Sequence, residues 1–218
     1  MNFTYLGRTG LRVSRLCLGT MNFGPRTSED DAHAIMDLAH EEGINFFDTA
    51  NRYGTEPGET ETIIGNWFAS GGGRRERTVI ATKVYGEMGK WPNESKLSAL
   101  NIRRALDASL RRLQTEYVDL YQFHHIDRNT PWEEIWQAIE VAVQAGKILY
   151  AGSSNFAGWH IADAQAAAAR RNLRAWSASS RCTTCSYATS SSRSSRPRSI
   201  TGSASSLGLR CRAACSVG

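Results

Sequence analysis

A small set of polar residues in this chain has the side-chain types needed to deliver a proton. Asp48, Lys83 and His124 each close a short apolar run of the sequence, and Tyr53 follows Asp48 just before a glycine. A phenol has a pKa near 10, and a neighbouring ammonium lowers that pKa because it stabilises the phenolate. A carboxylate can hold the lysine charged, and an imidazole can bind a carbonyl oxygen. Together these groups suit protonation of a carbonyl oxygen while a hydride arrives at the carbon.

Each of these residues has an ordinary structural explanation when it is taken alone. An Asp after a strand commonly caps a turn, a Lys there is commonly solvated, and a Tyr in a loop is unremarkable as a packing residue. His125 also competes with His124, although the alternation of side chains along a strand favours His124 pointing inward. The chemical interpretation therefore depends on whether the fold brings Asp48, Tyr53, Lys83 and His124 together.

The elements that must position these residues alternate between strand and helix. A turn at 7–10 predicts an N-terminal hairpin, and five strand–helix pairs follow it. The predicted strands are 12–21, 44–48, 78–83, 118–124 and 148–152. The predicted helices are 28–43, 59–68, 97–113, 130–146 and 157–171.

The predicted strands are short and continuously apolar, which is typical of parallel strands buried on both faces. Two α/β architectures fit this pattern, an open doubly wound sheet and a (β/α)8 barrel. The chain has no G-x-G-x-x-G after its first strand, which disfavours the dinucleotide-binding doubly wound sheet. In a barrel all the carboxyl strand ends meet at one mouth. We therefore predict an incomplete (β/α)8 TIM barrel, with about five β/α units after the N-terminal hairpin.

Two predictions concern helix surfaces. The helix at 28–43 is expected to begin at a Ser28 cap and to bury Ile35, Met36, Leu38 and Ala39. The arginine pair at 111–112 is expected to lie on an exposed helix face.

Five motifs in order identify a family. The chain resembles the aldo-keto reductases, in particular the bacterial branch that is also similar to the potassium-channel β subunits. The resemblance covers the first 173 residues. The matching strings are LGTMNFG from Leu18, FFDTANRYG from Phe46, ATKV from Ala81, DLYQFHHID from Asp119 and GKILYAGSSNF from Gly146.

The resemblance implies a role for each matched site residue. The family's catalytic tetrad falls on Asp48, Tyr53, Lys83 and His124. The implied cofactor is NADPH, with NAD left open, and the implied substrate is a small aldehyde or ketone. The cofactor-binding residues implied are Thr20, Met21, Asp48, Ser154 and Asn155, with the last two at the nicotinamide carboxamide. No metal is implied. The alternative is a non-catalytic cofactor- or partner-binding module similar to the channel β subunits.

Charge and cysteine content change after residue 173. The first 173 residues carry 19 basic and 21 acidic groups, whereas residues 174–218 carry seven Arg, no acidic residue and 14 Ser. A basic tail can bind nucleic acid, but only Trp176 and Tyr187 could stack on bases, so nucleic acid is not expected as a partner. The tail's cysteines, which include Cys182-x-x-Cys185, have no nearby His, so zinc is not expected either.

From this change of composition we infer a frameshift near Arg174. When codons for 175–190 are read two bases out of phase, they permit the string LVSEQ-SLYNLLVRDV, and 200–218 permits YGLGVIPWSPL, both similar to later segments of the family. We therefore divide the chain into the N-terminal part of the barrel, 1–173, and a non-family tail, 174–218. The sixth strand is expected to be replaced, and the chain is expected to lack turnover.

Location is predicted from absent signals. No apolar run approaches the roughly 18 residues of a membrane span, and the N-terminus has no basic region followed by an apolar core. The chain is therefore expected to be cytoplasmic, with no membrane association.

Overall fold

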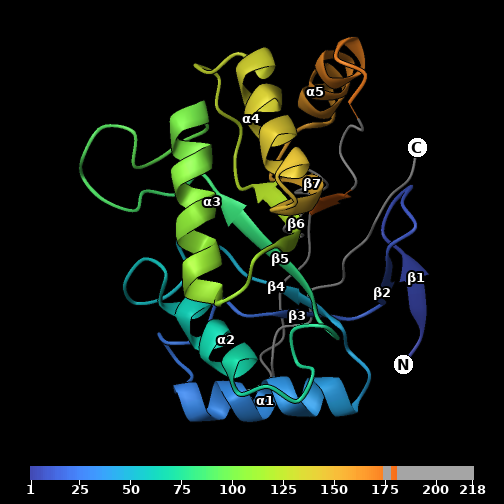
Figure 1. The fold of residues 1–218 in the computed structure, drawn as a ribbon, viewed down its shortest axis with the longest axis vertical. Coiled ribbons are helices and arrows are strands. Elements are labelled where there is room, and N and C mark those ends of the chain that lie inside the picture. Colours follow the sequence, from blue (N-terminus) through green and yellow to red (C-terminus); the bar gives the residue numbers. More distant parts are fainter. Residues whose placement is uncertain (174–177, 181–218) are drawn as a thin grey trace, which may run out of the picture.

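A parallel β-sheet with helices along one side forms the body of the molecule (Figure 1). The computed structural model describes residues 1–173 and 178–180. The strands of the sheet are β3 (Cys17–Gly19), β4 (Phe46–Asp48), β5 (Val79–Val84), β6 (Val118–Phe123), β7 (Ile148–Ser154) and β8 (Ala178–Ser180). The helices are α1 (Glu29–Glu41), α2 (Glu59–Ala69), α3 (Ala99–Leu113), α4 (Trp132–Gln144) and α5 (Gly158–Arg170). A separate antiparallel hairpin pairs β1 (Phe3–Tyr5) with β2 (Arg12–Ser14).

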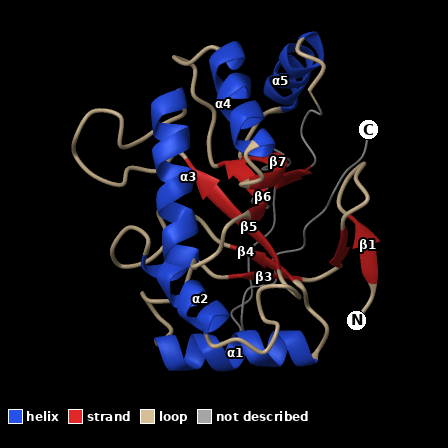
Figure 2. Ribbon diagram, in the orientation of Figure 1, coloured by secondary structure: helices blue, strands red, loops and turns tan. Residues whose placement is uncertain are grey.

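Strand order decides between the two predicted architectures. The strands follow one another across the sheet as β3-β4-β5-β6-β7-β8, all parallel, with no reversal of direction. A doubly wound sheet reverses its strand order at a switch point. Helices α1 to α5 curve round one side of the sheet, and the hairpin lies on the other (Figure 2). The fold is α/β and corresponds to part of a TIM barrel, as the sequence predicted. Within the described residues the sheet stays open, with β3 and β8 at its edges.

Alternating side chains of the strands build two cores. Outward residues such as Phe47, Ile80 and Tyr121 are fully buried and pack against the helices in the larger core. Inward residues such as Ala81 form a smaller core that the hairpin covers with Leu6 and Val13. The inner face is therefore apolar toward the amino ends of the strands, which leaves its polar residues at the carboxyl ends.

The predicted strand 12–21 is wrong in its extent, because it divides into β2 and β3 in different sheets. The chain turns where the Ser14 hydroxyl donates to the Leu16 carbonyl at 2.6 Å. The Asn45 side chain accepts the Ser14 amide proton at 2.7 Å and so fixes that turn against the sheet. Before this turn the chain pairs as β2 with β1, and after it the chain pairs as β3 with β4.

The family's sixth strand was expected to be replaced, and residues of the predicted tail do lie beside β7. Residues Ala178–Ser180 pair in parallel with Gly152–Ser154 of β7. An exposed strand edge offers unpaired amides and carbonyls that bind any extended backbone, whatever its side-chain pattern. The rest of the predicted tail, including Cys182 and Cys185, lies outside the described residues.

The prediction for α1 is partly wrong. Ser28 caps the helix as expected, by accepting the Asp31 amide proton. Met36 and Ala39 are buried as predicted. Ile35 is 39% exposed and Leu38 is 57% exposed, because the inward stripe follows Ala32, Met36 and Ala39 at helical spacing. In the described part of the chain, no helix has the length and apolar character needed to cross a membrane.

Candidate active site

A buried ion pair lies on the inner face of the sheet near its carboxyl edge. The Lys83 ammonium on β5 donates to the Asp48 carboxylate on β4 at 2.6 Å and to the Thr49 carbonyl at 2.8 Å. Its third contact is the Tyr53 phenol oxygen, at 3.3 Å. The Lys83 side chain is 3% exposed, whereas that of Asp48 is 27% exposed. The three predicted residues Asp48, Tyr53 and Lys83 therefore form one connected cluster.

The charge on Lys83 is stabilised by its partners. Burial alone lowers the pKa of a lysine, but the Asp48 carboxylate and the Tyr53 phenol outweigh burial, so the pKa of Lys83 lies above its ordinary value. Lys83 is accordingly an ammonium at neutral pH, and it faces the Tyr53 ring with its nitrogen 4.9 Å from the ring centroid.

The turn after Tyr53 depends on a glycine. Gly54 has a φ of +124°, and a Cβ at this position would come within 2.5 Å of the Glu59 side chain. The Tyr53 carbonyl accepts the amide proton of Thr60, in the first turn of α2, at 3.3 Å. The position of Tyr53 is therefore tied to the start of α2.

His124 lies just after β6, on the other side of Tyr53. Its ring meets the Tyr53 ring edge to face at a centroid distance of 5.7 Å, and it stacks on the exposed His125. Burial lowers the pKa of His124 to about 4, and the positive charge of Lys83 and the neighbouring His125 contribute to that shift. His124 is therefore neutral at pH 7, with one ring N–H available to donate.

Gln122 belongs to this cluster and was missed by the sequence analysis. Its side-chain amide donates to the second oxygen of Asp48 at 3.0 Å, and the residue is 1% exposed. Gln122 pairs with Lys83 in the sheet register and precedes His124 by two positions, so the three side chains share the inner face. That spacing was the signal in the sequence that could have identified Gln122.

The residues assigned to the cofactor lie at the same edge of the sheet. Thr20 is buried, and its hydroxyl donates to the Asp48 carbonyl at 3.0 Å. Met21 beside it is 60% exposed. Ser154 ends β7 and is buried, and the exposed Asn155 donates its side-chain amide to the His124 carbonyl at 3.1 Å. The structure therefore places all of them at the carboxyl strand ends, on strands that flank the tetrad.

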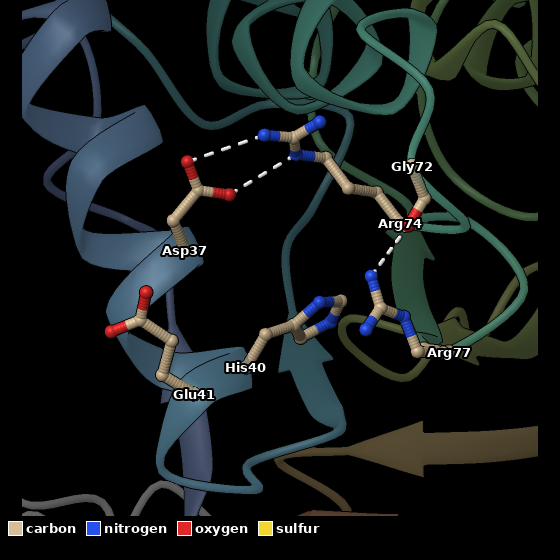
Figure 3. Close-up of a pocket in the computed structure, with 6 residues that line it drawn as sticks. All are labelled: Asp37, His40, Glu41, Gly72, Arg74 and Arg77. Atoms are coloured by element: carbon tan, nitrogen blue, oxygen red, sulfur yellow. Dashed lines mark hydrogen bonds and ion pairs between the residues drawn. The ribbon is translucent and has the colours of Figure 1, made fainter.

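A second polar group lies where the α1 C-terminus meets the loop before β5 (Figure 3). There Asp37 accepts two hydrogen bonds from Arg74, and Arg77 donates to the Gly72 carbonyl. The bond from Arg74 is the main reason that the pKa of Asp37 lies below its ordinary value. This is the amino end of the strands, opposite the tetrad, and its arginines fasten the loop at 70–78.

The outer face of β5 carries another charged cluster. Thr82 donates to Glu61 of α2 at 2.5 Å, and Arg112 of α3 holds the other Glu61 oxygen at 2.7 and 2.8 Å. Glu61 is fully buried and the Arg112 side chain is 22% exposed. The prediction of an exposed face for 111–112 is therefore wrong for Arg112, which turns inward to neutralise a buried carboxylate.

Comparison with known proteins shows which family this chain is similar to. The model of the "Aldo/keto reductase family" matches residues 15–182. A curated relative in Bacillus subtilis (strain 168), named "Uncharacterized oxidoreductase YrpG", is 60% identical over 179 residues. That alignment covers 79% of this chain and 55% of the relative, so the chain spans about half the length of the relative it matches.

Proposed function

The chain belongs to the aldo/keto reductase family, and from that premise we propose that its site is built to reduce aldehydes or ketones to alcohols with NADPH. The observation that carries the proposal is the Lys83 ammonium, which touches both the Asp48 carboxylate and the Tyr53 phenol. A buried ammonium beside a phenol is the arrangement expected of a tuned proton donor.

Each residue of the tetrad has a separate role in this proposal. Tyr53 donates its proton to the carbonyl oxygen as that oxygen gains negative charge, and the Lys83 ammonium stabilises the phenolate that remains. Asp48 keeps Lys83 charged and directed at Tyr53. His124, whose pKa is lowered to about 4, stays neutral and donates a ring N–H that orients the carbonyl oxygen. Gln122 holds the second Asp48 oxygen, so the carboxylate cannot turn away from Lys83.

The carboxyl edge of the sheet offers groups that fit a nicotinamide. A carboxamide both donates and accepts hydrogen bonds, and the Ser154 hydroxyl and Asn155 amide can do the same. Asn155 has a φ of +60°, and its bond to the His124 carbonyl fixes its side chain beside the tetrad. A bound nicotinamide cofactor supplies the hydride that reaches the carbonyl carbon. We assign Thr20 and Met21 to the same cofactor face.

We also propose that the 218-residue chain does not turn over substrate. In the described residues the sheet is open between β3 and β8, whereas a closed barrel joins its first and last strands. The basis is the proposed frameshift near Arg174, which replaces the family text that follows. Sequencing the gene across this point tests the frameshift. A single uninterrupted frame, with no family text in the second frame, would refute it.

Turnover tests the function and the frameshift together. NADPH oxidation with an aromatic aldehyde is followed for the 218-residue chain and for a protein whose C-terminal part is read in the second frame. We expect no turnover by the first and steady turnover by the second. In the second protein, Tyr53→Phe should lower kcat by about a hundredfold or more, because it removes the donated proton.

The outcomes separate the alternatives. Turnover by the 218-residue chain contradicts its proposed inactivity. Full activity of the Tyr53→Phe variant contradicts the role of Tyr53. NADPH binding without turnover by the second-frame protein favours the alternative of a cofactor-binding module.

A further inference from the structure

Thr82 and Lys83 are consecutive residues of β5, so their side chains point to opposite faces of the sheet. Lys83 reaches the tetrad on the inner face. On the outer face, Thr82 donates to the buried carboxylate of Glu61 at 2.5 Å. This hydrogen bond therefore holds the strand at the position next to Lys83.

Glu61 also belongs to the element that holds Tyr53. It lies in the first turn of α2, next to Thr60, whose amide donates to the Tyr53 carbonyl at 3.3 Å and whose hydroxyl donates to the Phe23 carbonyl at 2.8 Å. Glu61 thus connects the segment that presents Tyr53 with the strand that presents Lys83.

Arg112 fixes Glu61 from the side of α3. Its guanidinium makes two bonds to one Glu61 oxygen, at 2.7 and 2.8 Å. Helices α2 and α3 approach so closely at Gly65 that a Cβ on this residue would lie 1.9 Å from the Arg112 carbonyl oxygen. A Cβ on Gly58, which precedes α2, would also meet the Arg112 side chain at 2.5 Å. The position of Glu61 is therefore set by close packing as well as by charge.

We propose that Glu61 is a positioning residue, and that the connection Thr82–Glu61–Arg112 sets the separation between the Lys83 ammonium and the Tyr53 phenol. The proposal rests on the proposed proton-donor function of Tyr53. It adds that residues outside the site determine how close the Lys83 ammonium lies to the Tyr53 phenol. Glu61 does not face the inner side of the sheet, so its effect is transmitted through β5 and α2.

The readout is the ionisation of Tyr53 in the full 218-residue chain, measured by NMR of protein labelled with carbon-13 at tyrosine Cζ. The chain has seven tyrosines, and the Tyr53 signal is assigned by its loss in Tyr53→Phe. Lys83 and His124 contact Tyr53, and Asp48 binds Lys83 beside it. This measurement requires neither cofactor nor turnover.

Two substitutions of Thr82 separate its hydroxyl from its bulk. Thr82→Val keeps the volume and removes the bond to Glu61, so we expect the pKa of Tyr53 to rise by about half a unit or more as the ammonium moves away. Thr82→Ser keeps the hydroxyl and should leave that pKa at the wild-type value.

The matched control is Asp119→Asn. Asp119 lies on β6 and also belongs to a buried ion pair that contacts β5. It binds Arg75 at 3.0 Å and accepts the amide proton of Ile80, which lies near the amino end of β5, away from Lys83. If Thr82→Val raises the pKa of Tyr53 by more than Asp119→Asn and Thr82→Ser do, the proposal holds. If Thr82→Val does not exceed these controls, the proposal is overturned.

Lys83→Met separates this proposal from the function on which it rests. A pKa of Tyr53 that rises in Lys83→Met but not in Thr82→Val overturns the positioning role alone. A pKa that does not change in Lys83→Met overturns the proton-donor function, and the positioning role with it.

Discussion

Two consecutive residues of β5, Thr82 and Lys83, belong to two charged clusters on opposite faces of the sheet. The outer cluster is Thr82, Glu61 and Arg112, and the inner cluster is Lys83, Asp48, Tyr53, Gln122 and His124. In the outer cluster the carboxylate is fully buried, and both its oxygens are bound by protein groups. In the inner cluster the carboxylate is 27% exposed and the ammonium ends at a half-buried phenol. In the outer cluster the buried charge is fully bound by protein groups and serves stability. In the inner cluster the buried ammonium also contacts a phenol that can donate a proton, and this contact distinguishes a reactive site.

The largest effect is expected where a buried charge would be left alone. Arg112→Met removes the positive partner of Glu61, and stranding a buried carboxylate costs about 3–5 kcal/mol of stability. Urea unfolding measures the loss. Arg111→Met is the matched control, because Arg111 is exposed, and it should change stability by about 0.5 kcal/mol or less. Equal losses of stability in the two variants would contradict the claim that Arg112 neutralises a buried carboxylate.

The close contact of α2 with α3 should give the next effect. Gly65→Ala places a methyl group where the Arg112 carbonyl oxygen now lies, and overpacking of this kind costs about 1–3 kcal/mol. Gly158→Ala is the control, because a Cβ there meets no atom within 4 Å. The melting temperatures of both variants test this contact. If Gly65→Ala is as stable as Gly158→Ala, the close contact of α2 with α3 is contradicted.

A smaller effect is expected from pH at the inner cluster. The pKa of His124 is lowered to about 4 in the folded chain and is near 6.5 in an unfolded one, so the unfolded chain binds a proton first as pH falls. This residue's contribution to stability is therefore complete above pH 6.5 and is lost between about pH 6.5 and 4. The loss should be about 1–2 kcal/mol, after allowance for partial exposure.

Unfolding measured across that pH window tests the shift. The slope should flatten in His124→Gln, which cannot gain the proton. Proton NMR of the five histidines should show His124 titrating lowest. A His124 that titrates near 6.5 would contradict the burial and charge assigned to this side of the site.

The inner cluster was the more predictable of the two. Asp48, Lys83 and His124 each end an apolar run, and parallel strands bring such ends to one edge whatever the details of packing. The inward position of Gln122 is indicated by its spacing of two residues from His124, and its pairing with Lys83 in the sheet establishes that position. The outer cluster joins Glu61 to a residue 51 positions away, on a helix whose arginine pair looks solvated in the sequence. The spacing of apolar residues within one helix or strand cannot predict a contact between residues so far apart in the sequence.

The strands were predicted least well where backbone pairing rather than side-chain pattern decides. The run 12–21 has a uniform strand character, yet hydrogen bonds at Ser14 divide it between two sheets. Ala178–Ser180 has no apolar pattern, yet it pairs with the edge of β7. The first 173 residues otherwise fold into the five β/α units that their periodicity indicates.

In the proposed site, Asp48 keeps the buried Lys83 charged beside Tyr53. The chain has only four lysines, and Lys83 is 2% exposed, so nitrogen NMR of the side-chain amines can follow it separately. We predict that the pKa of Lys83 lies above 10.5 in the wild-type chain. In Asp48→Asn it should fall below the ordinary lysine value, because burial then acts without its main counterweight. A Lys83 that titrates below 10.5 in the wild type, or that Asp48→Asn leaves unchanged, would contradict the account.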